Sequence, residues 1–167
     1  MELKQLAIHE AGHTVVGYTL GLACNNLILT HEGEGDSFIH TAYPNNMCDY
    51  EGKSLHERNS NLRAEAIASC AGLAAEHVFF KVPLNIDDEN AQSDFQNIIK
   101  CERNGLRIRG NRGGFTSDDE TSSYIPRGLV EAKRLVKRNR KTIQQLADIL
   151  VEKKNLSAEE VERLLKK

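Results

Sequence analysis

The sequence predicts a mainly α-helical domain with one small β-hairpin, on three observations. Apolar residues recur at helical spacing along most of the chain. Two capping boxes mark helix starts, and one stretch, residues 26–43, combines two extended runs with a polar turn. The chain has 167 residues, of which 40% are apolar and 28% charged, so it can form a hydrophobic core. We therefore expect residues 1–167 to form a single domain, with residues 123–167 as its C-terminal helical part.

The first predicted helix covers residues 2–20. Its apolar side chains recur at spacings of three to five, and Gly21 ends the pattern. Gly12 lies inside this helix, where glycine costs about 1 kcal/mol relative to alanine. We therefore expect a need for a bare surface at Gly12, from close helix packing or a close ligand. The apolar positions are Leu3, Leu6, Ala7, Ala11, Val15 and Leu20.

The predicted hairpin occupies residues 26–43. An apolar run at residues 27–29 begins the first strand, and the polar residues 32–36, which include two glycines, form the turn. The second strand resumes at Ser37. A short sheet beside helices fits the mainly α fold class.

Capping boxes at residues 54–57 and 157–160 each pair a serine with a glutamate three residues later. The first predicts a long, alanine-rich helix that runs to about residue 80 and is ended by Pro83. The second predicts a short last helix that reaches residue 167.

Two further helices are predicted between these boxes. Asp87 or Asp88 caps the first, which covers residues 89–106. Residues 105–122 then form a glycine-rich loop, for which we expect disorder or a mobile flap. A long helix follows over residues 126–154, where apolar periodicity returns.

The charge balance argues against nucleic acid or an anionic membrane surface as a partner, since the net charge is −2. The basic residues within 127–141 predict the solvated face of a helix. No apolar stretch approaches the roughly 20 residues that span a bilayer, and no signal peptide is visible. We expect no membrane segment in this chain.

The four cysteines have no C-x-x-C spacing, which argues against a zinc knuckle or a thioredoxin-like pair. Cys70 lies in an apolar helical stretch and is predicted to be a small core residue. A chain of this size does not need disulfides, so we expect a reducing, cytoplasmic location. The location would be cytoplasm-facing if the chain is excised from a membrane-anchored parent.

The motif H-E-A-G-H at residues 9–13 is typical of a catalytic metal site. His9 and His13 are four residues apart in a helix, so both can direct ring nitrogens at one metal ion. Catalytic zinc takes three protein ligands and leaves one position to water, whose pKa falls to about 7. Glu10 is placed to accept the proton of that water. The motif predicts Zn²⁺-dependent hydrolysis of peptide bonds, with His9 and His13 as metal ligands and Glu10 as the catalytic base.

The third ligand must come from elsewhere in the chain. The metzincin pattern is absent, because Val16 stands where that pattern has glycine and no histidine follows at the required distance. The residue types alone leave several acidic or histidine side chains open. Glu76 has two further interpretations: support that orients a ligand histidine from behind, or a partly buried helix residue with a hydrogen-bond partner. His77 is predicted to be a surface histidine or one with its hydrogen bonds satisfied. The candidates are Glu76, His77, Asp87, Asp88 and Asp94.

Two further segments follow I-H-E-A-G-H in the chain. Residues 71–80 read A-G-L-A-A-E-H-V-F-F, and residues 90–95 read N-A-Q-S-D-F. Together and in this order, the three segments resemble the peptidase domain of FtsH-type ATP-dependent zinc proteases. The second is similar to the family's G-R-x-A-E-E-x-x-F segment and the third to its G-A-S-N-D-L segment. The resemblance implies a zincin-like helical peptidase domain of the FtsH type, with Asp94 as the third zinc ligand.

The chain departs from the family pattern at several positions. Leu73 stands in place of an arginine, His77 in place of a glutamate, and Asn90 in place of a glycine. No G-x-x-x-x-G-K-[ST] phosphate loop occurs in the sequence, so we expect no ATPase module. The expected substrates are unfolded polypeptides or peptides. An ATPase partner in trans and a homo-oligomer are both compatible with the resemblance.

The sequence thus supports a zinc metallopeptidase that acts as an endopeptidase. The alternative is a non-catalytic binding or regulatory module derived from an FtsH-type peptidase. The missing ATPase module and the altered segments favour this alternative. Glu10 argues against that alternative, because it binds no metal and a dead site has no need of it. A third interpretation is the excised peptidase domain of a longer, membrane-anchored protease.

Overall fold

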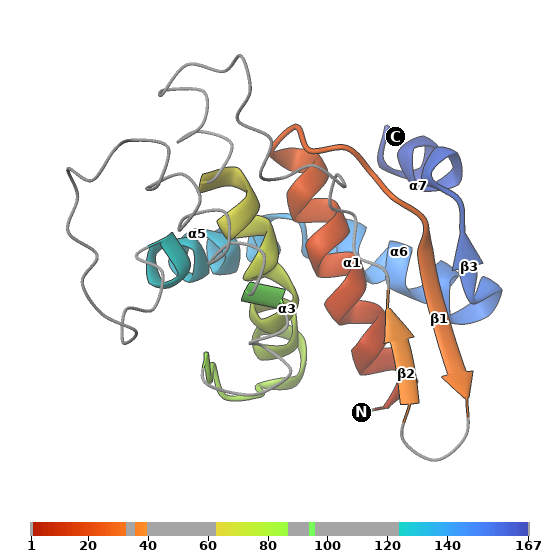
Figure 1. Ribbon diagram of the computed structural model, residues 1–167, viewed down its shortest axis with the longest axis horizontal. Coiled ribbons are helices and arrows are strands. Elements are labelled where there is room, and N and C mark those ends of the chain that lie inside the picture. The colour runs from red at the N-terminus through yellow and green to blue at the C-terminus, as the bar shows by residue number, and fades with distance from the viewer. Residues whose placement is uncertain (1, 33–35, 40–62, 87–93, 96–123, 167) are drawn as a thin grey trace, which may run out of the picture.

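The computed structural model describes residues 2–32, 36–39, 63–86, 94–95 and 124–166 (Figure 1). This part of the chain is mainly helical with a small antiparallel sheet, as predicted. The elements, in chain order, are α1 (Leu3–Thr19), β1 (Leu27–Glu32), β2 (Asp36–Ile39), α3 (Ala71–Phe80), α5 (Tyr124–Arg138), α6 (Arg140–Lys153), β3 (Asn155–Leu156) and α7 (Ala158–Leu165).

Helix α1 lies in the middle of the molecule, with α3 beside it and α6 behind it (Figure 1). Every residue from Leu6 to Gly17 is buried. Over these residues the helix has no polar face turned to solvent, and its polar side chains lie within the interior together with its apolar ones. The side chains of this buried stretch are therefore shielded from solvent.

Helices α1 and α3 approach each other closely at Gly12. A Cβ atom at Gly12 would lie 2.8 Å from the Ala71 carbonyl oxygen and 2.8 Å from the Ala75 Cβ. The bare surface expected at Gly12 is confirmed, and its cause is close helix packing. The contact brings the α1 side chains on either side of Gly12 against α3.

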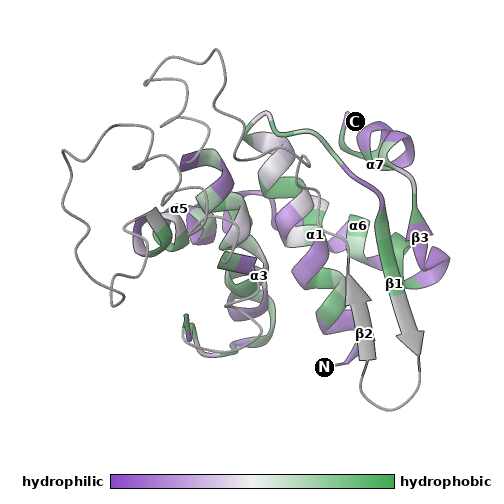
Figure 2. Ribbon diagram, in the orientation of Figure 1, coloured by the Kyte–Doolittle hydropathy of each residue, from purple (hydrophilic) through white to green (hydrophobic). Residues whose placement is uncertain are grey.

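The hydrophobic core lies where α1, α3, α5 and α6 meet one another and the sheet. Cys70 is part of it, fully buried, as the sequence predicted. Figure 2 shows the contrast between α3, which is largely hydrophobic, and α7, which is largely hydrophilic. Side chains with no exposed surface include Ile8, Val16, Leu27, Val136, Ile143, Leu150 and Leu156.

The sheet has three antiparallel strands in the order β2-β1-β3. The predicted hairpin is confirmed over its described residues, since β1 pairs with β2 from Leu29↔Ile39 to Glu32↔Asp36. Strand β3 was not predicted. It has only two residues, and it is extended because Leu156 pairs with Leu27 across the sheet, a contact that local sequence does not encode.

The helix predicted over residues 126–154 is wrong as a single element. Two helices, α5 and α6, meet at Asn139, whose backbone has left the helical conformation (φ −99°, ψ 17°). The Asn139 side-chain amide donates a hydrogen bond of 2.9 Å to the Leu135 carbonyl oxygen. Asparagine favours such local bonds over continued helix, which accounts for the break.

The helix predicted to reach residue 80 is also interrupted. Residues 63–69 are helical, Cys70 is a turn, and α3 begins at Ala71. The Ala68 carbonyl oxygen, just before the turn, accepts a hydrogen bond from the His13 ring. The interruption therefore coincides with a backbone group that is engaged by another helix.

The second capping box is confirmed: the Ser157 side chain accepts from the Glu160 N–H, and the Glu160 side chain accepts from the Ser157 N–H. The first capping box, at residues 54–57, and the loop at residues 105–122 lie outside the described residues. Of the helix predicted over residues 89–106, only residues 94–95 are described, and both are helical. Within the described ranges, no helix is both long and apolar enough to cross a membrane.

Candidate metal centre

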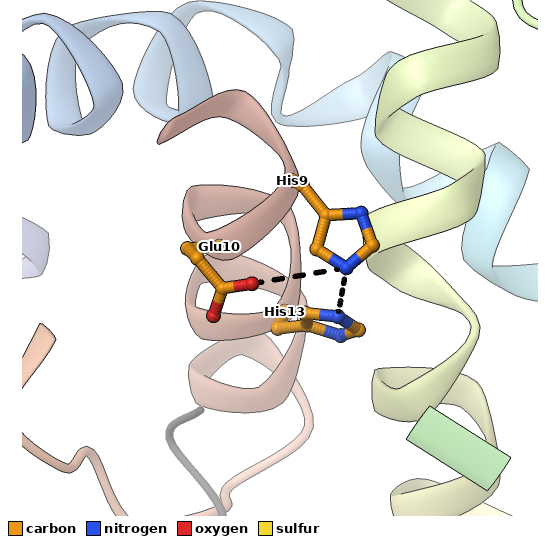
Figure 3. Close-up of side chains that lie close together, drawn as sticks. All are labelled: His9, Glu10 and His13. Carbon is orange, nitrogen blue, oxygen red and sulfur yellow. Dashed lines mark hydrogen bonds and ion pairs between the residues drawn. The ribbon is translucent and has the colours of Figure 1, made fainter. Parts of the chain in front are cut away.

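His9 and His13 lie on the face of α1 that meets α3, one helical turn apart. Their Nε2 atoms are 3.0 Å from each other, and the two rings meet edge to face (Figure 3). Both rings are buried, with His9 8% and His13 1% exposed. The i, i+4 spacing has therefore brought two nitrogens to one point inside the protein.

The hydrogen bonds behind the rings fix which nitrogen carries the proton. His9 Nδ1 lies 2.6 Å from Glu76 Oε1, and His13 Nδ1 lies 2.7 Å from the Ala68 carbonyl oxygen. A carboxylate and a carbonyl only accept, so each Nδ1 donates, and a ring without a second proton carries its lone pair on Nε2. Two lone pairs 3.0 Å apart repel each other unless positive charge lies between them. The pair is therefore suited to share one proton or to bind one cation.

Asp94 supplies a third atom at the same point. Its Oδ2 lies 3.3 Å from His9 Nε2 and 3.5 Å from His13 Nε2. This oxygen is buried and accepts no hydrogen bond from the described residues. Tetrahedral zinc with ligands at 2.0–2.1 Å separates them from one another by about 3.3 Å. The three edges of 3.0, 3.3 and 3.5 Å therefore match one tetrahedral face around a single ion.

Glu10 lies beside this triangle, 1% exposed. Its Oε1 is 3.7 Å from His9 Nε2, and its Oε2 accepts no hydrogen bond within the described part of the chain (Figure 3). His9, Glu10 and His13 offer ligand atoms that all lie within 4.8 Å of one another. The Asp94 Oδ2 lies 3.3 Å from His9 Nε2, closer than the Glu10 Oε1 at 3.7 Å.

The other candidates for the third ligand lie elsewhere. Glu76 is behind His9, on its Nδ1 side, in agreement with the supporting role considered for it. His77 Nδ1 bonds the Val82 carbonyl oxygen at 2.9 Å, so His77 is a histidine with a satisfied hydrogen bond, as predicted. Asp87 and Asp88 lie outside the described residues.

The titratable side chains of the centre shift one another's pKa values. Burial alone would lower the pKa of His9, but the Asp94 and Glu76 carboxylates beside the ring and the nearby Glu10 charge raise it to about 10. Burial raises the pKa of Glu10 to about 7. Burial would raise the pKa of Asp94 as well, yet the His13 and His9 rings hold it well below its usual range.

The pKa of Glu76 is also lowered; burial opposes this shift, which the hydrogen bonds from His9 and Gln5 outweigh. Three buried carboxyl groups, those of Glu10, Glu76 and Asp94, thus surround the two rings. Buried negative charge is costly unless it is paired, so the centre requires positive charge. A proton on a ring meets that requirement in part, and a divalent cation meets it more fully.

Gly72 on α3 completes the space in front of the rings. A Cβ atom there would collide with His9 Nε2 and His13 Nε2 and would lie 2.6 Å from His9 Cε1. The backbone of α3 therefore leaves room for an ion where any side chain would fill it. A glycine inside a helix is the sequence signal for this role, and this role was not predicted from the sequence.

The described structure contains a buried group of His9, Glu10 and His13 that could hold a metal ion. A scan against protein-family models finds none that matches the chain, and a search of curated proteins finds no match. The assignment of the centre therefore depends on the geometry of its side chains.

Proposed function

We propose that this chain is a zinc-dependent endopeptidase that hydrolyses peptide bonds of unfolded polypeptides or peptides. The observation that carries the proposal is the triangle of His9 Nε2, His13 Nε2 and Asp94 Oδ2, with a buried carboxylate, Glu10, beside it. A set of two imidazoles and one carboxylate with tetrahedral edges suits zinc and resembles catalytic rather than structural sites, which use four protein ligands.

The order of the motifs supports an FtsH-type peptidase. Residues 9–13 lie on α1, residues 71–80 form α3, and Asp94 follows in a helical segment. The histidines, Gly72 and Glu76 of the first two segments meet across the α1–α3 contact. The resemblance predicted Asp94 as the third ligand, and its Oδ2 lies beside both histidine nitrogens.

In this proposal each side chain has one role. His9, His13 and Asp94 hold the zinc ion, which when bound acidifies a water molecule and polarises the carbonyl group of the scissile bond. Glu10 accepts a proton from the attacking water and later donates it to the leaving amine. Its Oε2, which accepts no hydrogen bond from the described residues, is available for that exchange, and burial keeps bulk water from competing.

The test is metal content measured together with cleavage of a fluorogenic, unfolded protein such as labelled casein. We expect the purified protein to bind one zinc ion and to cleave casein, and chelation to abolish cleavage. Glu10→Gln keeps the shape of the side chain but removes the base, so the variant should retain zinc and lose at least about 100-fold in cleavage rate.

Two outcomes would contradict the proposal. Cleavage by the Glu10→Gln protein at the unmodified rate would remove Glu10 as the base. Stoichiometric zinc in the unmodified protein without any cleavage would favour the non-catalytic binding or regulatory module. His9→Ala serves as the control that loses both zinc and cleavage.

A further inference from the structure

We propose that Gln5 is a positioning residue that orients the metal ligand His9 by fixing the Glu76 carboxylate. The inference rests on the proposed function only in requiring that His9 binds a metal ion. Gln5 Nε2 donates a hydrogen bond of 2.6 Å to Glu76 Oε2, while the other oxygen, Oε1, faces His9 Nδ1 at the same distance. The carboxylate therefore bridges two residues of α1.

The spacing along α1 makes the bridge stiff. Gln5 and His9 are four residues apart and therefore lie on the same helix face, one turn above the other. Glu76 reaches them from α3, with its carboxylate buried between the two helices. With a short hydrogen bond at each oxygen, the carboxylate cannot rotate without losing one of them. Its plane is fixed, and so is the His9 ring that donates to it.

The amide of Gln5 suits this role because it carries no charge. A lysine or arginine in its place would neutralise Glu76 and weaken the pull of the carboxylate on the His9 N–H. The neutral donor leaves the negative charge of Glu76 available to His9. Since Nδ1 donates to Glu76, His9 directs Nε2 at His13 and Asp94. Gln5 touches none of the ligand atoms and acts only through Glu76.

The experiment compares two substitutions that retain the length of the side chain. Gln5→Met removes the donor and Gln5→Glu replaces it with a like charge. The readouts are the zinc dissociation constant from chelator competition and the visible absorption spectrum of the cobalt(II)-loaded protein, which reports ligand geometry. We expect Gln5→Met to weaken zinc binding about tenfold, the lower end for loss of an outer partner of a metal ligand. Gln5→Glu should weaken it more, and both should change the cobalt spectrum.

Two control variants separate positioning from stability. Lys4→Ala changes the neighbouring residue, whose ammonium pairs with Asp148 at the surface, 3.7 Å away. Val161→Ala trims a fully buried side chain on α7, away from the centre. Val161→Ala should lower the melting temperature of the metal-free protein, and both controls should leave the zinc affinity and the cobalt spectrum unchanged.

A double-substitution cycle tests the route through Glu76. In a Glu76→Ala background, Gln5→Met should weaken zinc binding by less than about twofold, because the carboxylate that transmits its effect is gone. If the unmodified protein binds zinc tightly and the Gln5→Met protein binds it with equal affinity and an unchanged cobalt spectrum, the role of Gln5 is overturned. The proposed function would stand in that case. An unmodified protein that binds no zinc would instead overturn the proposed function.

Discussion

Two ring nitrogens 3.0 Å apart are the central feature at the scale of single residues. Each ring is held from behind by an acceptor, Glu76 for His9 and the Ala68 carbonyl for His13. In neutral rings held this way both Nε2 atoms are acceptors, whereas buried polar atoms in a protein core are usually paired as donor and acceptor. An ion bound by both nitrogens and by Asp94 satisfies all three atoms at once.

Gly72→Ala is the sharpest test of the space in front of the rings. Alanine favours a helix by about 1 kcal/mol over glycine, so the substitution should not weaken α3 through its backbone. The new Cβ would nonetheless collide with both Nε2 atoms. We expect zinc affinity to fall at least about tenfold while the far-ultraviolet circular dichroism spectrum stays unchanged. Affinity is measured by chelator competition.

Gly17→Ala is the matched control on α1. A Cβ there would meet nothing closer than 3.8 Å, which is ordinary contact. It should raise the stability of the helix slightly and leave zinc affinity as it was. Equal zinc affinity in the Gly72→Ala and Gly17→Ala proteins would contradict the placement of the ion between Gly72 and the rings.

The sequence identified the residues whose pattern is local. The i, i+4 histidines and Glu10 were predicted from the motif, and Asp94 from a resemblance. Gln5 and Gly72 were not found as parts of the centre. Their roles depend on the crossing of α1 and α3, which joins positions 71 residues apart in the case of Gln5 and Glu76. No local pattern contains that information.

At the scale of elements, the junction of α6, β3 and α7 shows which elements a short sequence pattern can predict. Lys154 ends α6 with a positive φ of 64°, two residues pair with β1, and Ser157 opens α7. The capping box was predictable because serine and glutamate are three residues apart. The strand was not, since pairing with Leu27 and Ile28 alone defines it.

Ser157→Ala removes the acceptor for the Glu160 N–H. Loss of such a cap costs about 1 kcal/mol, which corresponds to a fall of about 2–4 °C in melting temperature for a domain of this size. Ser157→Asp retains an acceptor and should melt within about 1 °C of the unmodified protein. Thermal denaturation followed by circular dichroism measures both. Equal falls for both variants would show that the cap does not stabilise α7.

The breaks at Cys70 and Asn139 show the limit of periodicity at this scale. Apolar spacing continues through both positions, so each pair of helices was predicted as one. A side-chain hydrogen bond accompanies each break: Asn139 bonds the Leu135 carbonyl oxygen, and His13 bonds the Ala68 carbonyl oxygen. Asparagine is a weak local signal for a break, whereas the contact from His13 requires the folded molecule.

At the scale of the whole molecule, α1 contributes both to the hydrophobic core and to the candidate metal centre. It is buried on every side from Leu6 to Gly17, so it organises the core, and it also carries the histidines and Glu10. Buried carboxylates reduce stability unless charge is supplied to them. Metal binding would therefore stabilise the folded chain as well as complete the centre. The side chains of the site therefore belong to the same buried region as the hydrophobic core.

The most direct test of the central claim is anomalous diffraction at the zinc absorption edge from crystals of the zinc-loaded protein. We predict one peak at about 2.0–2.1 Å from His9 Nε2, His13 Nε2 and Asp94 Oδ2, with the Glu10 carboxylate beside the ion and not bound to it. A peak ligated by Glu10 in place of Asp94, or no peak between the two histidines, would contradict it.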